Sequence, residues 1–146
     1  MSKIIVLYYS RTGNTEKMAN AVVEGAKAVQ DVKVDLEYHT TPEELANYSA
    51  IAVGTPTYHH DMNSDVKTFF EEAAVKTINL KNKIGAAFGS YGWSGEAPSL
   101  VLEIMKNKFQ MRTLEPPLVI KYEPDQTGLE KCRELGKRLA ELASRI

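Results

Sequence analysis

Five short apolar runs alternate along the chain with longer stretches whose apolar side chains recur at helical spacing, and this alternation constrains the fold most. The runs are expected to form strands because they are short and rich in β-branched residues, and the amphipathic stretches are expected to form helices. The expected strands are 4–9, 32–38, 50–54, 84–89 and 118–120. The expected helices are a short one beginning at Thr41 and longer ones over 15–29, 64–74, 97–109 and 127–146. This alternation predicts one α/β domain, residues 1–146, with a parallel sheet and right-handed crossovers.

The character of two strands predicts their order in the sheet. The run 4–9 is continuously apolar, which is typical of a strand buried on both faces, whereas 32–38 alternates polar and apolar residues, as an edge strand does. These patterns favour a three-layer, doubly wound sheet with five parallel strands in the order 2-1-3-4-5. Ligands bind such sheets beyond the carboxyl ends of the strands, at the switch point between strands 1 and 3. We therefore expect the site in the loops after strands 1, 3 and 4.

Composition excludes several classes of function. The 146-residue chain carries 18 Lys+Arg and 19 Asp+Glu, a net charge of −1, and a dedicated nucleic-acid binder would usually be basic. No apolar run approaches the ~20 residues that span a membrane, and 4–9 is too short for the apolar core of a secretory signal. The only cysteine, Cys132, leaves no internal disulfide and lies on an apolar helix stripe. We expect a cytoplasmic protein that binds neither nucleic acid nor membrane.

The loop after the first strand predicts a phosphate site. It joins a buried strand to a helix start, where unpaired N–H groups and the helix dipole favour an anion. Its hydroxyl and amide side chains add donors, and Gly13 allows the backbone to approach closely. The loop lacks the lysine of the Walker A motif and the three glycines of dinucleotide folds, which favours a single phosphate monoester. A βα turn with ordinary helix capping is the alternative.

The two loops after strands 3 and 4 predict a site for a flat ring. The loop 54–63 is long and irregular, and long loops in compact domains are often functional. The loop 89–96 holds the only tryptophan among three glycines, so its backbone can pass close to a ligand while Tyr91 and Trp93 offer flat faces. Packing of Trp93 against the end of the sheet is the alternative. Together the three loops describe a planar heterocycle on a phosphorylated tail, which FMN fits.

Three segments resemble the flavodoxin family: SRTGNT at 10–15, GTPTY at 54–58 and GSYGWSGE at 89–96. The third looks especially like the flavodoxin domain of flavodiiron proteins. The resemblance covers the whole chain and implies a flavodoxin-like fold of the short-chain type, because no long insertion splits the fifth strand. It also implies that FMN binds non-covalently.

The resemblance further implies which residues hold the cofactor. Those of the first loop are Ser10, Arg11, Thr12, Gly13, Asn14 and Thr15, of which Ser10, Thr12, Asn14 and Thr15 would hold the phosphate. Those on one side of the ring are Pro56, Thr57, Tyr58 and His59, and those on the other are Ser90, Tyr91, Gly92, Trp93, Ser94 and Gly95, with Trp93 or Tyr91 against the ring. A histidine at the ring would titrate near neutral pH, and a solvated loop histidine is the alternative. We expect no metal at His59 and His60, because adjacent histidines point in different directions.

Three functions follow from these expectations. The first is a monomeric FMN electron carrier with no catalytic residues of its own, which shuttles low-potential electrons between redox protein partners, from a reductase or ferredoxin-like donor to an acceptor enzyme. The second is an FMN-dependent NAD(P)H or quinone reductase, which the small size disfavours. The third is a binding module for another phosphorylated ligand. Because Met1 lies almost at the first strand, we expect neither the metallo-β-lactamase-like domain of flavodiiron proteins nor their oxygen or nitric oxide reduction.

Overall fold

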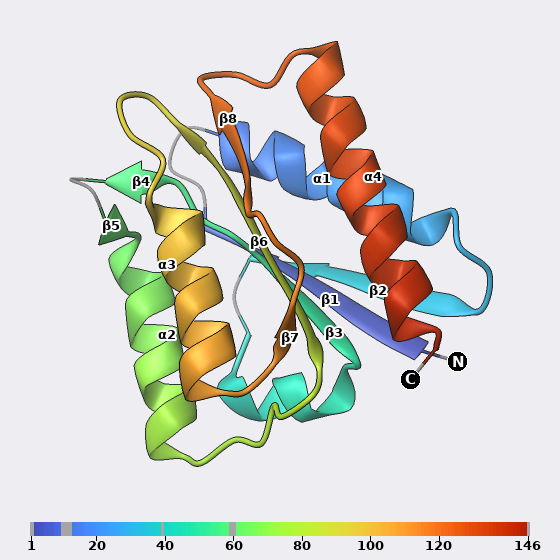
Figure 1. The fold of residues 1–146 in the computed structure, drawn as a ribbon, viewed down its shortest axis with the longest axis vertical. Helices are drawn as coiled ribbons and strands as arrows, with labels where there is room; N and C mark the ends of the chain where they lie inside the picture. The colour runs from blue at the N-terminus through green and yellow to red at the C-terminus, as the bar shows by residue number, and fades with distance from the viewer. Residues whose placement is uncertain (1, 10–12, 39, 59–60, 146) are drawn as a thin grey trace.

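A parallel sheet lies between two layers of helices (Figure 1). The computed structural model describes residues 2–9, 13–38, 40–58 and 61–145. The sheet consists of β1 (Ser2–Tyr8), β2 (Val32–Glu37), β3 (Ala50–Gly54), β6 (Ile84–Tyr91), β7 (Arg112–Thr113) and β8 (Leu118–Lys121). Its order is β2-β1-β3-β6-β7, and β8 also pairs with β6, so the expected order 2-1-3-4-5 is confirmed.

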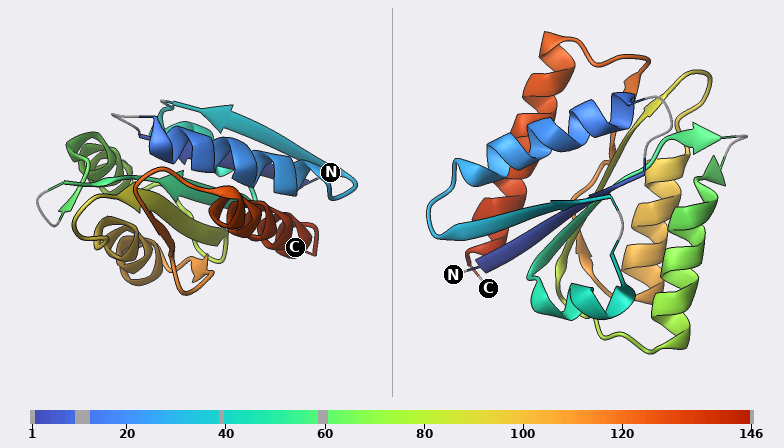
Figure 2. Two further views of the ribbon diagram at one scale, coloured as in Figure 1. Left: turned by 90° about the horizontal axis from the view of Figure 1, so that it is seen from above. Right: turned by 180° about the vertical axis from the view of Figure 1, so that it is seen from behind.

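Two helices cover each face of the sheet (Figure 2). The helices of one face are α1 (Asn14–Lys27) and α4 (Gln126–Ala143), and those of the other are α2 (Ser64–Val75) and α3 (Ala97–Glu103). Side chains from the two faces of β1 enter different clusters: Ile4 packs with α1 and α4, whereas Ile5 packs with α2 and α3. This double burial explains why the first strand has no polar position between Ile4 and Leu7.

The carboxyl ends of the three central strands lie at one edge of the sheet. β1 and β3 end level, because Tyr8 pairs with Gly54, and Gly54 pairs with Phe88, from which β6 continues to Tyr91. The loops that follow these strands therefore meet at this edge. This is the edge at which the sequence predicts the site.

The strand predicted over 118–120 is β8, and a second short strand, β7, shares the edge of β6 with it. β7 pairs with Ile84 and Gly85 at the start of β6, and β8 pairs with residues 88–91 at its end. The intervening residues 114–117 belong to neither strand. β7 escapes prediction because Arg112 and Thr113 do not form an apolar run.

Three local predictions need correction. The helix expected over 127–146 begins one residue earlier, at Gln126, because Asp125 is its N-cap and the Asp125 carboxylate accepts from the Gly128 N–H at 2.8 Å. The helix beginning after Thr41 is a 3₁₀-helix, η1 (Pro42–Asn47), without a side-chain cap. The helix expected over 97–109 continues past α3 as a π-helical turn, η2 (Ile104–Lys108).

Two further features concern the cysteine and the possibility of a membrane-spanning helix. Cys132 is buried, and burial raises the pKa of its thiol to about 12, which supports its assignment as a small core residue. Within the ranges that the structure covers, no helix combines the length and apolar character needed to cross a membrane.

Candidate functional site

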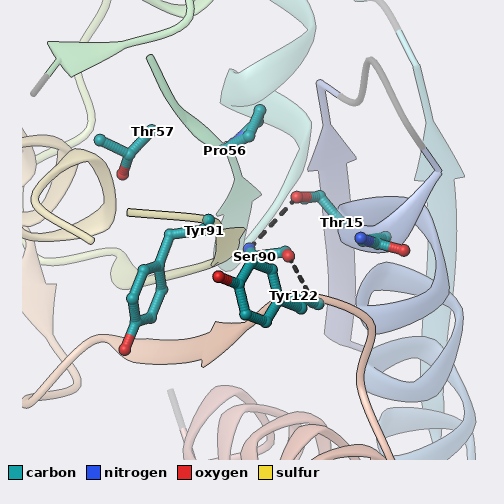
Figure 3. A pocket seen from close by; sticks show the side chains of 8 residues that line it. Thr15, Pro56, Thr57, Ser90, Tyr91 and Tyr122 are labelled. Atoms are coloured by element: carbon teal, nitrogen blue, oxygen red, sulfur yellow. Dashed lines mark hydrogen bonds between the residues drawn. The ribbon is translucent and has the colours of Figure 1, made fainter. Parts of the chain in front are cut away.

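A cavity of about 220 Å³ opens at the carboxyl edge of the sheet (Figure 3). Among the described residues, four segments contribute to it: the start of α1, the loop after β3, the end of β6 with the residue after it, and the residue after β8. The residues lining it are Asn14, Thr15, Pro56, Thr57, Ser90, Tyr91, Gly92 and Tyr122. Segments far apart in the sequence thus meet where the topology predicts.

The start of α1 forms one end of this cavity. Gly13 is the N-cap residue and has a φ of 93°, a left-handed conformation that most other residues adopt only with strain. A glycine N-cap has no side chain that could accept from the first N–H groups of the helix, so these donors lie next to the cavity. This end suits an anion both by its donors and by the positive end of the helix dipole.

The hydroxyl of Thr15 is buried and fixed at this end. Thr15 is 1% exposed, and its Oγ1 accepts a hydrogen bond from the Ser90 N–H at 3.3 Å. β3 ends at Gly54, which pairs with Phe88, so no strand reaches the level of Ser90 on that side. Thr15 thereby satisfies a backbone donor that would otherwise be buried without a partner.

Ser90 also ties the cavity to the β8 side. Its Oγ donates to the Tyr122 carbonyl at 2.6 Å, and the Tyr122 N–H donates to the Tyr91 carbonyl at 2.7 Å (Figure 3). Beside this contact, Lys17 of α1 forms an ion pair with Glu123, and the lysine lowers the pKa of that carboxyl. Through Ser90, the end of β6 therefore bonds to Thr15 of α1 on one side and to Tyr122, the residue after β8, on the other.

A close backbone contact fixes the loop after β3 against β6. A Cβ added to Gly89 would lie 1.9 Å from the Thr55 carbonyl oxygen, so only glycine allows the two chains to approach this closely. Thr55 is buried, and its Oγ1 donates to the Pro56 carbonyl at 3.0 Å and accepts from the Asn63 N–H at 3.2 Å. The wall of the cavity that carries Pro56 is therefore held from both ends of its loop.

The loop expected to be irregular contains a small hairpin. β4 (Thr57–Tyr58) pairs antiparallel with β5 (Asp61–Met62). The Thr57 Oγ1 accepts from the Ala97 N–H at 3.0 Å, at the first residue of α3, and Asp61 forms an ion pair with Lys67 of α2. The hydrogen bond from Lys67 lowers the pKa of Asp61. The hairpin is thus anchored to both helices of its face.

Aromatic side chains occupy the other end of the cavity. Tyr91 and Tyr122 line it, whereas Trp93 lies outside the lining and is 85% exposed. The exposure of Trp93 contradicts the alternative in which this residue packs against the end of the sheet. Tyr122 had no role in the sequence analysis, because no motif surrounds it and its place depends on Ser90, which is 32 positions away in the chain.

The structure brings together seven of the residues expected to hold the cofactor. These are Asn14, Thr15, Pro56, Thr57, Ser90, Tyr91 and Gly92. Tyr58, Trp93, Ser94 and Gly95 lie on the same loops but not in the lining, and Gly13 caps the helix beside it. The expectations for Ser10, Arg11, Thr12, His59 and His60 fall outside the described residues.

The residues present fit a planar ligand with a phosphate. At the α1 end the cavity has hydrogen-bond donors, and its described lining residues include no carboxylate. At the other end lie the aromatic rings of Tyr91 and Tyr122, with Gly92 beside them. FMN has both parts in one molecule.

Comparisons with known proteins agree with this geometry. The family model described as flavodoxin matches residues 6–136. A flavodoxin from Aquifex aeolicus is 33% identical over 160 residues, which cover 97% of this chain and 86% of that protein. The structure of a flavodoxin from the domain Archaea superposes with a TM-score of 0.87 at 41% identity, covering 97% of this chain and 99% of that one.

A longer relative is also similar. The type A flavoprotein fprA of Rhodobacter capsulatus is 41% identical over 145 residues, which make up 94% of this chain and 32% of that protein. The chain therefore spans about a third of the length of this relative. With its sheet order, its three converging loops and these matches, the chain belongs to the flavodoxin family, whose members bind FMN and transfer electrons to redox partners.

Proposed function

We propose that this cavity is the FMN site and that the protein uses it as an electron carrier between redox proteins. The observation that carries the proposal is the shared cavity itself. It joins the glycine-capped start of α1 and the buried Thr15 hydroxyl to the rings of Tyr91 and Tyr122.

The α1 end would hold the phosphate. The first N–H groups of the helix and the Asn14 amide donate toward it, and Thr15 keeps the end of β6 in place through Ser90. Ser10, Arg11 and Thr12 precede these residues directly in the motif and belong to the proposed set.

The loops after β3 and β6 would hold the ring. Pro56 and Thr57 form one wall, and Tyr91 with Gly92 forms another. His59 and the loop residues Tyr58, Trp93, Ser94 and Gly95 complete the proposed ring environment. Bound FMN supplies the redox chemistry, and these residues bind it, orient it and exclude water from one side.

The exposed end of the site supports an exchange of electrons with proteins. Trp93 offers an apolar surface at the aromatic end of the cavity, where a partner could come close to a bound ring. A reductase or ferredoxin-like donor and an acceptor enzyme are the proposed partners. The single domain, the monomeric state and the cytoplasmic location stay predictions.

Titration of the cofactor-free protein tests the proposal. FMN should bind at one molecule per chain and more tightly than riboflavin, because riboflavin lacks the phosphate that the α1 end would hold. Fluorescence quenching measures both affinities. Equal affinity for the two flavins, or no binding of either, would contradict the proposed site.

A second measurement separates the carrier from a reductase. The FMN-loaded protein is mixed with NADH or NADPH without an added reductase, and flavin absorbance is followed. A carrier should keep its absorbance over minutes and lose it only when a redox protein is added. Rapid bleaching by a nicotinamide alone would favour the reductase alternative.

A further inference from the structure

Tyr122 lines the cavity from a segment to which the sequence assigns no role. It follows β8 directly, and it is 61% exposed although it is a large aromatic residue. The hydroxyl of Tyr122 extends in Figure 3 toward the Tyr91 side and away from Thr15. The ring therefore faces the part of the cavity that is remote from the start of α1.

The backbone of Tyr122 is held in a conformation that tyrosine disfavours. Its φ is 60°, in the left-handed region, where asparagine and glycine are the common residues. Two hydrogen bonds hold it there, one from the Ser90 Oγ to its carbonyl and one from its N–H to the Tyr91 carbonyl. If this position served only as a turn, asparagine or glycine would be the less strained choice.

The neighbours of Tyr122 restrain the segment further. Glu123 pairs with Lys17 of α1, and Asp125 caps α4 through the Gly128 N–H. The segment 122–125 is thus attached to β6, to α1 and to α4, while the ring of Tyr122 lies in the cavity mouth beside Gly92. The backbone of Tyr122 is fixed while its ring stays mostly exposed, with the Lys121 Nζ 5.3 Å from the ring centroid. A fixed backbone and a largely exposed ring suit a side chain that packs against a planar ligand.

We propose that Tyr122 is a cofactor-contacting residue that covers the ring part of the bound flavin, and that Ser90 positions it. This inference rests on the proposed function. The tyrosine contributes the apolar face of its ring rather than a contact with the phosphate, because its ring points away from the α1 end.

The test compares two substitutions at this position. Tyr122→Asn removes the ring but suits the left-handed backbone, and it should weaken binding of both FMN and riboflavin about tenfold, the order of one aromatic stacking contact. Tyr122→Phe keeps the ring and should bind both flavins within about twofold of the unmodified protein. Val119→Ala, at an exposed position of β8, the strand that precedes Tyr122, is the matched control and should change neither affinity.

Each result has a defined meaning. Binding of FMN by Tyr122→Asn within about twofold of the unmodified protein would overturn the inference, and so would a loss for FMN without a loss for riboflavin. An equal loss in Tyr122→Phe and Tyr122→Asn would overturn the role of the ring face. Circular dichroism of the cofactor-free variants checks that they fold. If the unmodified protein binds neither flavin, the proposed function fails, which is a different result from all of these.

Discussion

The two ends of the cavity are built in opposite ways. At the α1 end, Thr15 is buried, its hydroxyl bonds to the main chain, and Gly89 lies nearby with its backbone in close contact with Thr55. At the aromatic end, Trp93 and Tyr122 expose most of their surfaces. The closed end is therefore part of the core and is fixed as the protein folds. The open end contributes little to folding and is available to a ligand or a protein partner.

This comparison predicts different consequences for glycine substitutions at the two ends. Gly89→Ala should lower the free energy of unfolding by about 3 kcal/mol, because its Cβ would overlap the Thr55 carbonyl and the strand or loop would have to move. Gly92→Ala should change it by less than about 0.5 kcal/mol, because the nearest atom to its Cβ is 3.8 Å away. Urea unfolding of both variants measures the difference. An equal loss of unfolding free energy in the two variants would contradict the distinction between a closed and an open end.

A substitution at Thr15 should affect FMN more than riboflavin. The Thr15 Oγ1 accepts from the Ser90 N–H, so its own hydrogen would be the one donated to the phosphate. Thr15→Val keeps the shape but removes this donor, so we expect FMN affinity to fall about 10- to 100-fold, as for loss of a hydrogen bond to a charged group. Riboflavin affinity should fall by less than about threefold. Thr68→Val, at an exposed position of α2, is the control, and fluorescence titration gives all the affinities. A parallel loss for both flavins would place the phosphate elsewhere.

The open end should tolerate removal of its largest side chain. Trp93→Ala should leave the free energy of unfolding within about 0.5 kcal/mol of its original value, since the indole is exposed. Tyr91→Ala should weaken FMN binding more than Trp93→Ala does, because Tyr91 lines the cavity and Trp93 does not. A larger loss of affinity for the tryptophan variant would mean that the loop closes over the ligand on binding.

The smallest expected effect concerns the hairpin between the two ends. Lys67 lowers the pKa of Asp61 below its ordinary value of 3.8, so the unfolded chain binds this proton more readily than the folded one. The pair therefore stabilises the fold above about pH 4 and loses this contribution as the pH falls through the lowered pKa. Because both side chains are largely exposed, the contribution is only about 0.5 kcal/mol. Urea unfolding of Asp61→Asn at pH 7 and pH 3 should show a smaller difference from the unmodified protein at pH 3 than at pH 7.

The sheet order and the location of the site could be predicted because they depend on patterns that are local in the sequence. A continuously apolar run such as 4–9 can only lie in the middle of the sheet, and the alternation of 32–38 suits an edge. Once the order is known, the topology directs the three loops to one edge. The positions of Asn14, Thr15, Ser90 and Tyr91 follow from this rule, although the rule does not say which side chains face inward.

Features that depend on contacts between distant segments, or on elements of only a few residues, could not be predicted. Tyr122 becomes a cavity residue only because Ser90 holds its backbone. The last helix begins at Gln126 rather than at 127, since the backbone of Asp125 is extended and its carboxylate accepts from the Gly128 N–H. The hairpin of β4 and β5 consists of two-residue strands, which are too short to produce a periodic pattern.

The division of the edge strand has a consequence for how this chain could be lengthened. β7 and β8 each hold their own register on β6, and between them Glu115 and Pro116 are exposed. Extra residues spliced between these two would leave both ladders intact and would emerge at the surface. The junction of Glu115 and Pro116 at the edge of the sheet is thus a position at which a new segment could be inserted without altering the structure around the cavity.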